Sequence, residues 1–166
     1  MAKRLLVFIA IFLFMVPVFA QSKMAVMPAV GSGSEGTAMA KSLTKELKSA
    51  YKIVKEISLN DADKLIDGGK FAKMKKCETK LSCVSKEAKG IKKADYVLLP
   101  VVSFDEEYTV TLHFYSTKNG RRLDKRTVNG ASDIDAEDLA ADVVAAVKDA
   151  VAKLAGGSSD EGEEEE

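Results

Sequence analysis

Residues 94–120 read ADYVLLPVVSFDEEYTVTLHFYSTKNG, and this stretch decides which kind of sheet the chain can build. Residues 94–104 are apolar at almost every position, which is typical of a central strand buried on both faces. Residues 108–117 alternate instead, with one apolar face and one face of threonines, His113 and Tyr115. We therefore expect His113 to be a polar-face residue, and no nucleophile or acid beside it suggests catalysis.

Three further strands follow from the flanking sequence. Residues 118–120 read KNG, and Asn-Gly accepts positive φ, so residues 121–128 should return as an antiparallel, charged edge strand. Near the amino terminus, residues 24–30 form an apolar run in which Pro28 indicates a sheet edge or a strand end. Residues 51–59 alternate and predict a second strand.

Helical periodicity fills the gaps between these strands. Apolar residues recur every three or four positions across residues 39–50, which predicts an amphipathic helix. Residues 60–93 look helical but broken, with Asp61 and Ser82 as candidate caps. Asp135 should cap a long final helix. The predicted fold class is mixed α/β (α+β), in the order β-α-β-α-β-β-β-α, with the helices packed on a mixed sheet.

The first twenty residues read as a secretory signal rather than as part of the fold. Lys3 and Arg4 precede an almost continuous apolar run, and small residues stand before the expected cleavage between Ala20 and Gln21. The alternative is a retained anchor, but sixteen apolar residues fall short of the roughly 20 that a span needs. We predict a signal peptide over residues 1–20 and an exported protein of the periplasm or cell envelope.

Charge divides the remaining chain into a basic body and an acidic tail. Without the two basic residues of the signal, the chain has 23 basic and 25 acidic side chains, a net charge of −2. Six of those acids lie in residues 160–166, so the body carries 23 against 19, or +4. Its length suits one compact domain over residues 21–156. The composition of residues 157–166 predicts a disordered acidic tail.

Cys77 and Cys83 are the two cysteines of the sequence. An even number in an exported chain favours a structural disulfide over free thiols. Six residues along a straight helix span about 9 Å, beyond the reach of a disulfide, so a bridge requires a turn between two helical pieces. Two cysteines and one distant histidine are too few ligands for a metal site, and we predict none.

Residues 31–36 read GSGSEG and match the dinucleotide fingerprint G-x-G-x-x-G. An acid should end the next strand about 20 residues on, and Glu56 and Asp61 bracket that position. The export signal and the hairpins argue against a dinucleotide fold, and Ser34 suits a helix cap, so we favour a capped turn. A weak site for a nucleotide or small anion at the helix amino terminus is the alternative. Its residues would be Gly33, Ser34 and Gly36.

Residues 70–93 contain nine lysines and two acids, Glu78 and Glu87, a net charge of +7. Such a cluster is most often a solvated helical surface. The alternative is an anion-binding surface for phospholipid or lipopolysaccharide headgroups, or for a partner protein. The lysines singled out for this role are Lys73, Lys76 and Lys80. Export argues against nucleic acid as the partner.

The pattern as a whole resembles the TolB amino-terminal-like domain and its relatives among CsgG-like envelope proteins. The resemblance covers about residues 23–155. The segments that carry it are KMAVMPAV, GTAMAKSLTKELKSAYKIV, YTVTLHFYSTKNGRRL and above all CETKLSCVSKEAKGIKKADYVLLPVV. It implies an envelope-associated interaction module and transfers no catalytic motif.

These observations lead to one functional hypothesis and one alternative. We expect an exported, non-enzymatic binding or assembly module of the envelope, without a cofactor, which acts through a protein partner or an anionic membrane surface. Its contact surface would be the lysine-rich segment or the exposed edge strand. The alternative is a nucleotide- or small-anion-binding protein, possibly an enzyme, that uses residues 31–36 at the helix amino terminus.

Overall fold

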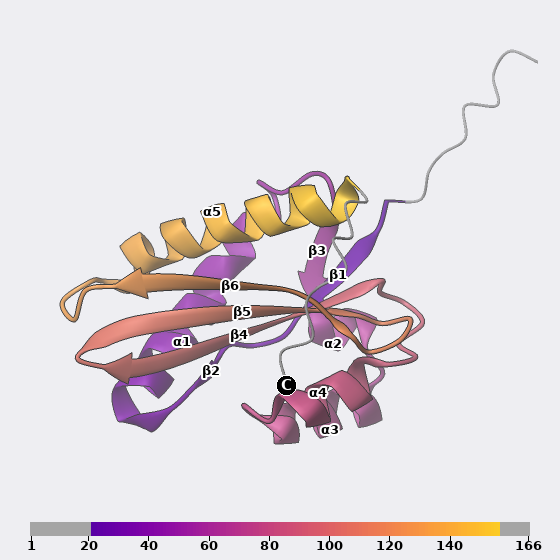
Figure 1. Ribbon diagram of the computed structural model, residues 1–166, viewed down its shortest axis with the longest axis horizontal. Helices are drawn as coiled ribbons and strands as arrows, with labels where there is room; N and C mark the ends of the chain where they lie inside the picture. The colour runs from indigo at the N-terminus through magenta and orange to yellow at the C-terminus, as the bar shows by residue number, and fades with distance from the viewer. Residues whose placement is uncertain (1–20, 157–166) are drawn as a thin grey trace, which may run out of the picture.

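A computed structural model describes residues 21–156, which form one mixed β-sheet with helices on both faces (Figure 1). The predicted signal peptide over residues 1–20 and the predicted tail over residues 157–166 lie outside the described residues. The strands are β1 (Lys23–Val26), β2 (Val30–Gly31), β3 (Ser58–Asp61), β4 (Tyr96–Asp105), β5 (Glu107–Ser116) and β6 (Arg122–Gly130). The helices are α1 (Gly33–Ala50), α2 (Ala62–Leu65), α3 (Gly68–Cys77), α4 (Leu81–Ala88) and α5 (Ala136–Ala155). The predicted mixed α/β fold is confirmed.

The sheet has the strand order β3-β1-β4-β5-β6, and the short β2 pairs with β4 farther along that strand. β1 is parallel to both β3 and β4, because the chain passes through helices before it returns to the sheet. β5 is antiparallel to β4 and β6, to which tight turns connect it. As predicted, β4 lies inside the sheet and β6 at its edge.

Two hydrophobic cores lie on opposite faces of this sheet. Leu98 and Val102 of β4 pack into the core beneath α1 and α5. Val97 and Leu99, which point the other way, pack into the core formed with α2, α3 and α4. Figure 1 shows α5 above the sheet and α3 and α4 below it. β4 is therefore apolar on both faces because it supplies both cores.

α5 follows its sequence prediction closely. The carboxylate of Asp135 accepts hydrogen bonds from the backbone N–H groups of Glu137 and Asp138, both at 2.9 Å. This satisfies two of the donors that a helix leaves unpaired at its amino end. The buried stripe consists of Leu139, Ala140, Val143, Val147, Ala150 and Val151.

Two predicted strands differ from the structure. The first one, residues 24–30, is divided into β1 and β2, with Pro28 in the gap, because proline cannot donate to the ladder. The second one, residues 51–59, shares only residues 58 and 59 with β3, which continues to Asp61. The N–H groups of Ile53 and Val54 bond to the carbonyl of Ala50 and prolong the end of α1 as a turn.

Three predicted caps also differ. Ser34 lies inside α1, which starts after Ser32. Ser82 lies inside α4, because the turn that joins the two cysteines brings the helix start forward to Leu81. Asp61 does stand at the N-cap of α2, but its side chain makes no capping hydrogen bond there. It binds other side chains instead, as described below.

Candidate functional site

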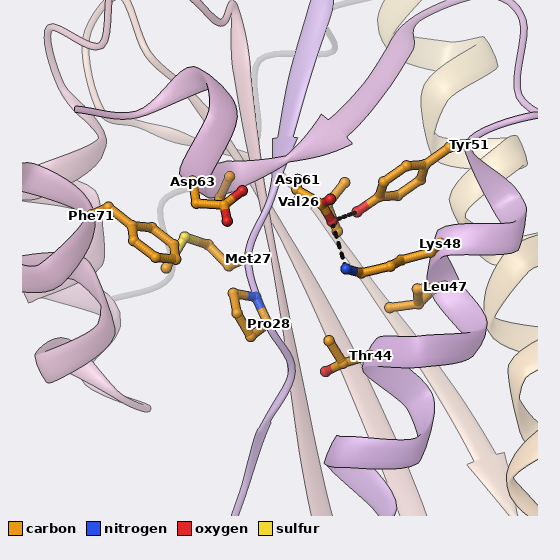
Figure 2. Close-up of a pocket in the computed structure, with 11 residues that line it drawn as sticks. Val26, Met27, Pro28, Thr44, Leu47, Lys48, Tyr51, Asp61, Asp63 and Phe71 are labelled. Carbon is orange, nitrogen blue, oxygen red and sulfur yellow. Dashed lines mark hydrogen bonds and ion pairs between the residues drawn. The ribbon is translucent and has the colours of Figure 1, made fainter. Parts of the chain in front are cut away.

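A small hollow lies where β1 and β3 end, between α1 on one side and α2 and α3 on the other (Figure 2). The carboxyl ends of neighbouring parallel strands are where α/β sheets commonly bind ligands. Met27, Pro28 and Phe71 contribute apolar surface to the hollow. Its volume is about 90 Å³, well below the roughly 300 Å³ at which pockets for small organic ligands begin. The hollow therefore has no room for a nucleotide.

Asp61 is the centre of the polar side of this hollow. Its carboxylate lies 3.3 Å from the Nζ of Lys48 and 3.2 Å from the Nζ of Lys64. The Tyr51 hydroxyl donates a hydrogen bond of 3.2 Å to the same carboxylate, as Figure 2 shows. These contacts join the end of α1 to the end of β3 and the start of α2.

The protonation states in the hollow do not suit acid–base chemistry near neutral pH. Partial burial opposes the ionisation of Asp61, but hydrogen bonds from Lys64, Lys48 and Tyr51 outweigh it and lower its pKa below the ordinary value. Burial, and next the charge of Asp61, raises the pKa of Tyr51. Asp61 thus stays a carboxylate and Tyr51 a phenol, whereas a general acid or base works best with a pKa near the operating pH.

Sequence reasoning did not find this hollow. It noted Asp61 only as a cap and as a possible acid at the end of the second strand. An available signal was the position of Asp61 at the end of a strand that is parallel to β1, because parallel strands end at the same side of a sheet. Lys48 and Tyr51 gave no such signal, since Lys48 reads as an ordinary surface position of the helix and Tyr51 as the first residue of the predicted strand 51–59.

The glycines of residues 31–36 serve close packing. A Cβ on Gly31 would lie 2.1 Å from the carbonyl oxygen of Gly36, and a Cβ on Gly36 would lie 3.2 Å from that of Val102. These two glycines let the first turn of α1 press against β2 and β4. Gly33 has φ +71 and, like Ser34, is exposed. Anion binding by Gly33, Ser34 and Gly36 stays a prediction, and Gly36 is buried.

Lys73, Lys76 and Lys80 are all exposed, the first two on α3 and the third at the N-cap of α4. They do not meet the glycine turn. In Figure 1 the segment that joins β2 to α1 lies at the left of the molecule, whereas α3 and α4 lie below its right half. The structure therefore separates the predicted anion-binding residues into two places.

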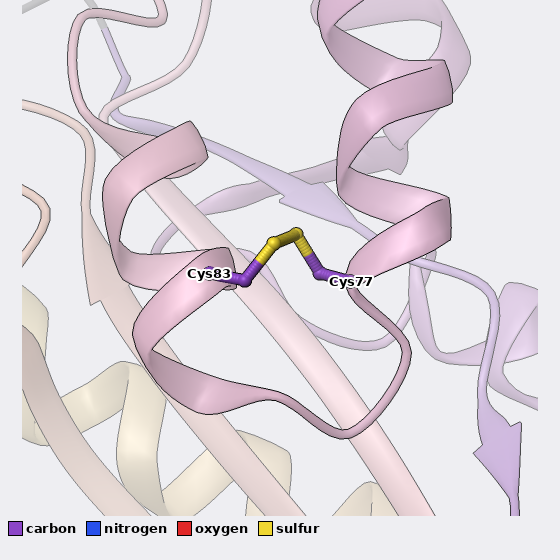
Figure 3. The surroundings of a disulfide bond; sticks show 2 residues. All are labelled: Cys77 and Cys83. Carbon is purple, nitrogen blue, oxygen red and sulfur yellow. A yellow bond between two sulfur atoms is a disulfide. The ribbon is translucent and has the colours of Figure 1, made fainter.

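A disulfide joins Cys77 to Cys83 with a Cα–Cα distance of 5.5 Å (Figure 3). Cys77 ends α3, and the next helix begins at Leu81, so a turn separates the two helical pieces as the sequence requires. Cys77 is buried in the core below the sheet. The bridge thus ties the lysine-bearing helices to each other beside that core.

His113 contradicts its prediction as a polar-face residue. Its side chain is buried with 5 % exposed, because it lies on the same face of the sheet as Leu99 and Tyr115, which pack into the core formed with α2, α3 and α4. Burial, and next the charges of Arg122 and Lys125, lowers the pKa of His113 to about 4. His113 Nδ1 and the Tyr115 hydroxyl have no hydrogen-bond partner among the described residues.

Two structural features are absent from residues 21–156. No group of three or more His, Cys, Asp or Glu side chains there is arranged to hold a metal ion. Over the same range, no helix combines the length and the apolar character that crossing a membrane requires.

Comparison with known proteins gives a likeness of fold. No protein-family model matches the sequence, and no curated protein matches it. A hypothetical protein from Chlamydia trachomatis superimposes with a TM-score of 0.54 at 11% identity, over 80% of this chain and 99% of that one. TolB from Acinetobacter baumannii gives 0.47 at 12% identity, over 83% of this chain and 29% of TolB. The carboxyl-terminal domain of LpoB from Escherichia coli gives 0.44 at 19% identity, over 75% and 93%. At these identities the likeness concerns the fold alone.

Proposed function

We propose that this protein is an exported, non-enzymatic binding module of the cell envelope that recruits a partner protein at the β6 edge of its sheet. One observation carries the proposal. β6 runs for nine residues and pairs only with β5 within the described part of the chain. The backbone N–H and C=O groups on the outer side of such a strand are a template for an added strand.

The side chains of β6 support the same reading. Edge strands usually carry charged residues that discourage pairing, and Arg122 and Lys125 are of this kind. Leu123 is apolar, and yet 43% of its surface is exposed to water. Among the described residues, the other large exposed apolar side chain is Ile53, in the turn after α1, at 48%. A strand added to β6 would remove Leu123 from water.

Three further features support the export, the family relationship and the non-enzymatic role in this proposal. The sequence of residues 1–20 supports export to the periplasm or cell envelope. The sequence segments quoted above support a relationship to the TolB amino-terminal-like and CsgG-like domains. The absence of an enzymatic role is supported by the hollow beside Asp61, whose polar side chains bind one another and whose volume is about 90 Å³.

Site-specific photo-cross-linking in intact cells tests this function. A photoreactive residue at Thr127, an exposed position of β6, should give one discrete adduct with an envelope protein. The same residue at Lys45, exposed on α1, should not give that adduct. The second variant, Leu123→Lys, places a charge where the added strand would pack and should abolish the Thr127 adduct.

Ile53→Lys is the matched control, because it places the same charge at an equally exposed apolar residue outside the sheet. The proposal predicts an undiminished Thr127 adduct in this control. Equal adducts from Thr127 and Lys45, no adduct from Thr127, or an adduct that survives Leu123→Lys would each contradict recruitment at β6.

A further inference from the structure

The lysine surface consists of the nine lysines of residues 70–93 and lies on the side of the molecule formed by α3 and α4. Eight of the nine are exposed, and Lys70 is partly buried. The apolar residues of the same helices, among them Met74 and Val84, face the sheet. The lysines of α3 and α4 therefore occupy the outer surface of this helical layer, and Lys92 and Lys93 are exposed in the segment after α4.

The charge of the lysine surface is not neutralised within the described residues. The ion pairs found there involve Lys48, Lys64 and Arg126, and none of the nine lysines. Lys70 Nζ donates to the carbonyl of Lys89, and Lys75 Nζ lies 5.8 Å from the centre of the Phe71 ring. Both contacts leave a full positive charge, and the two acids Glu78 and Glu87 leave a net charge of +7.

The residue type indicates the class of partner. Every basic residue between positions 70 and 93 is lysine, whereas Arg121, Arg122 and Arg126 stand in or next to β6. Arginine is the residue that recognises individual carboxylates or phosphates with two parallel hydrogen bonds, while lysine is a hydrated point charge on a flexible stem. A cluster of lysines alone fits a diffuse anionic surface better than a specific acidic protein.

The surroundings of the lysines indicate how such a surface is bound. The large exposed apolar side chains of the described residues are Ile53 and Leu123, and neither belongs to α3 or α4. The lysine surface therefore has no apolar anchor to insert between lipids. Attraction to the surface charge of a lipid bilayer remains, and it acts only within a Debye length, about 10 Å at 0.1 M salt.

We propose that the lysine surface binds the anionic headgroups of a lipid bilayer by electrostatic attraction, without insertion. The disulfide between Cys77 and Cys83 holds the end of α3 against α4, so Lys73, Lys76 and Lys80 meet the bilayer as one rigid group. This lipid site lies on α3 and α4, and it borders the start of β6, because the Ser85 hydroxyl of α4 donates a hydrogen bond to the Gly120 carbonyl in the turn before that strand.

Vesicle co-sedimentation tests the proposal with residues 21–166, since both cores are built from residues 24–151. The probes are phosphatidylcholine vesicles with and without phosphatidylglycerol. Each lysine near an anionic bilayer strengthens binding roughly fivefold, so the triple variant K73Q/K76Q/K80Q should bind phosphatidylglycerol vesicles roughly a hundredfold more weakly. Binding should also disappear in 1 M salt, where the Debye length is about 3 Å.

The matched control is K41Q/K45Q/K52Q, which removes the same charge from exposed lysines on or just after α1. Its binding should fall less than threefold, and circular dichroism should show that both variants are folded. Equal losses in the two variants, equal binding to vesicles without phosphatidylglycerol, or binding that survives 1 M salt would overturn the proposal. So would affinity for polyglutamate equal to that for phosphatidylglycerol vesicles, since it would point to an acidic protein instead.

Discussion

Gly31 is the residue on which the junction of β2 and α1 depends. A Cβ at this position would lie 2.1 Å from the Gly36 carbonyl oxygen and 2.5 Å from the Thr37 nitrogen. Both atoms belong to the backbone and cannot move aside like the end of a side chain. The glycine-rich match to a dinucleotide fingerprint thus has a packing explanation at its first position.

We expect Gly31→Ala to lower the free energy of unfolding by about 3 kcal/mol, because the first turn of α1 must move away from the sheet. Chemical denaturation measures this loss. The control is Gly68→Ala in α3, where an added Cβ has no atom within 4 Å and the change should be neutral or stabilise by about 0.5 kcal/mol. Equal effects at the two positions would contradict the steric explanation.

His113 links the stability of the protein to pH. Its pKa is 6.5 in its ordinary state and about 4 in the fold, so between these values the unfolded chain binds the proton more readily. The free energy of unfolding should therefore fall as the pH drops from about 6.5 to about 4, by up to roughly 3 kcal/mol. Above pH 6.5 this contribution is fully present.

Denaturation curves between pH 4 and pH 7 measure this slope, and His113→Gln, which cannot be protonated, should flatten it. The control is Asp61→Asn. The folded-state pKa of Asp61 is lowered below 3.8, so stability from its ionisation is lost mainly below the His113 window. A slope that persists in His113→Gln would contradict the assignment.

At the scale of elements, the pair α3 and α4 depends on its covalent link. The two helices have ten and eight residues, shorter than helices that are stable alone in water. The disulfide closes the small loop between Cys77 and Cys83, and the lysines on both sides of it repel one another. The disulfide therefore contributes more to holding α3 and α4 together than it would in a helix pair without surface charge.

The double variant C77A/C83A should lose about 2 kcal/mol of the free energy of unfolding, because the unfolded chain is no longer restricted by the loop. Equilibrium denaturation checks the loss. Reduction of the unmodified protein under native conditions is the parallel experiment and should give a similar loss. An unchanged midpoint in both experiments would show that the disulfide does not contribute to stability.

The connections between elements show which structural features the local sequence pattern was sufficient to predict. The α5 cap at Asp135 and the antiparallel β5–β6 pair around the turn at residues 117–121 were predicted correctly. Both depend on contacts between residues that are close in the sequence. The division between β1 and β2 was predicted only in part, from Pro28. The sequence did not predict β2 itself, because this strand forms by pairing with Val101 and Val102, some 70 residues away.

At the scale of the whole molecule, the sheet separates two hydrophobic cores and contributes side chains to both. β4 contributes to both of them, and α1 with α5 covers one face while α2, α3 and α4 cover the other. This arrangement leaves β6 at one edge and the lysine surface on the outside of one helical layer. The two proposed contacts, with a protein strand and with a lipid surface, thus use different parts of one fold.

The sequence alone determined the fold class, the central position of β4, the α5 helix and the turn between the cysteines, because periodicity, capping and turn chemistry are local. Only the tertiary structure decided that Asp61 meets Lys48 and Tyr51, and that the face of β5 with His113 packs into the second core. It also decided that Gly31 touches Gly36. These contacts depend on which strands become neighbours and on how closely a helix approaches the sheet. A local sequence pattern does not determine either of these, because it describes only residues that are close in the sequence.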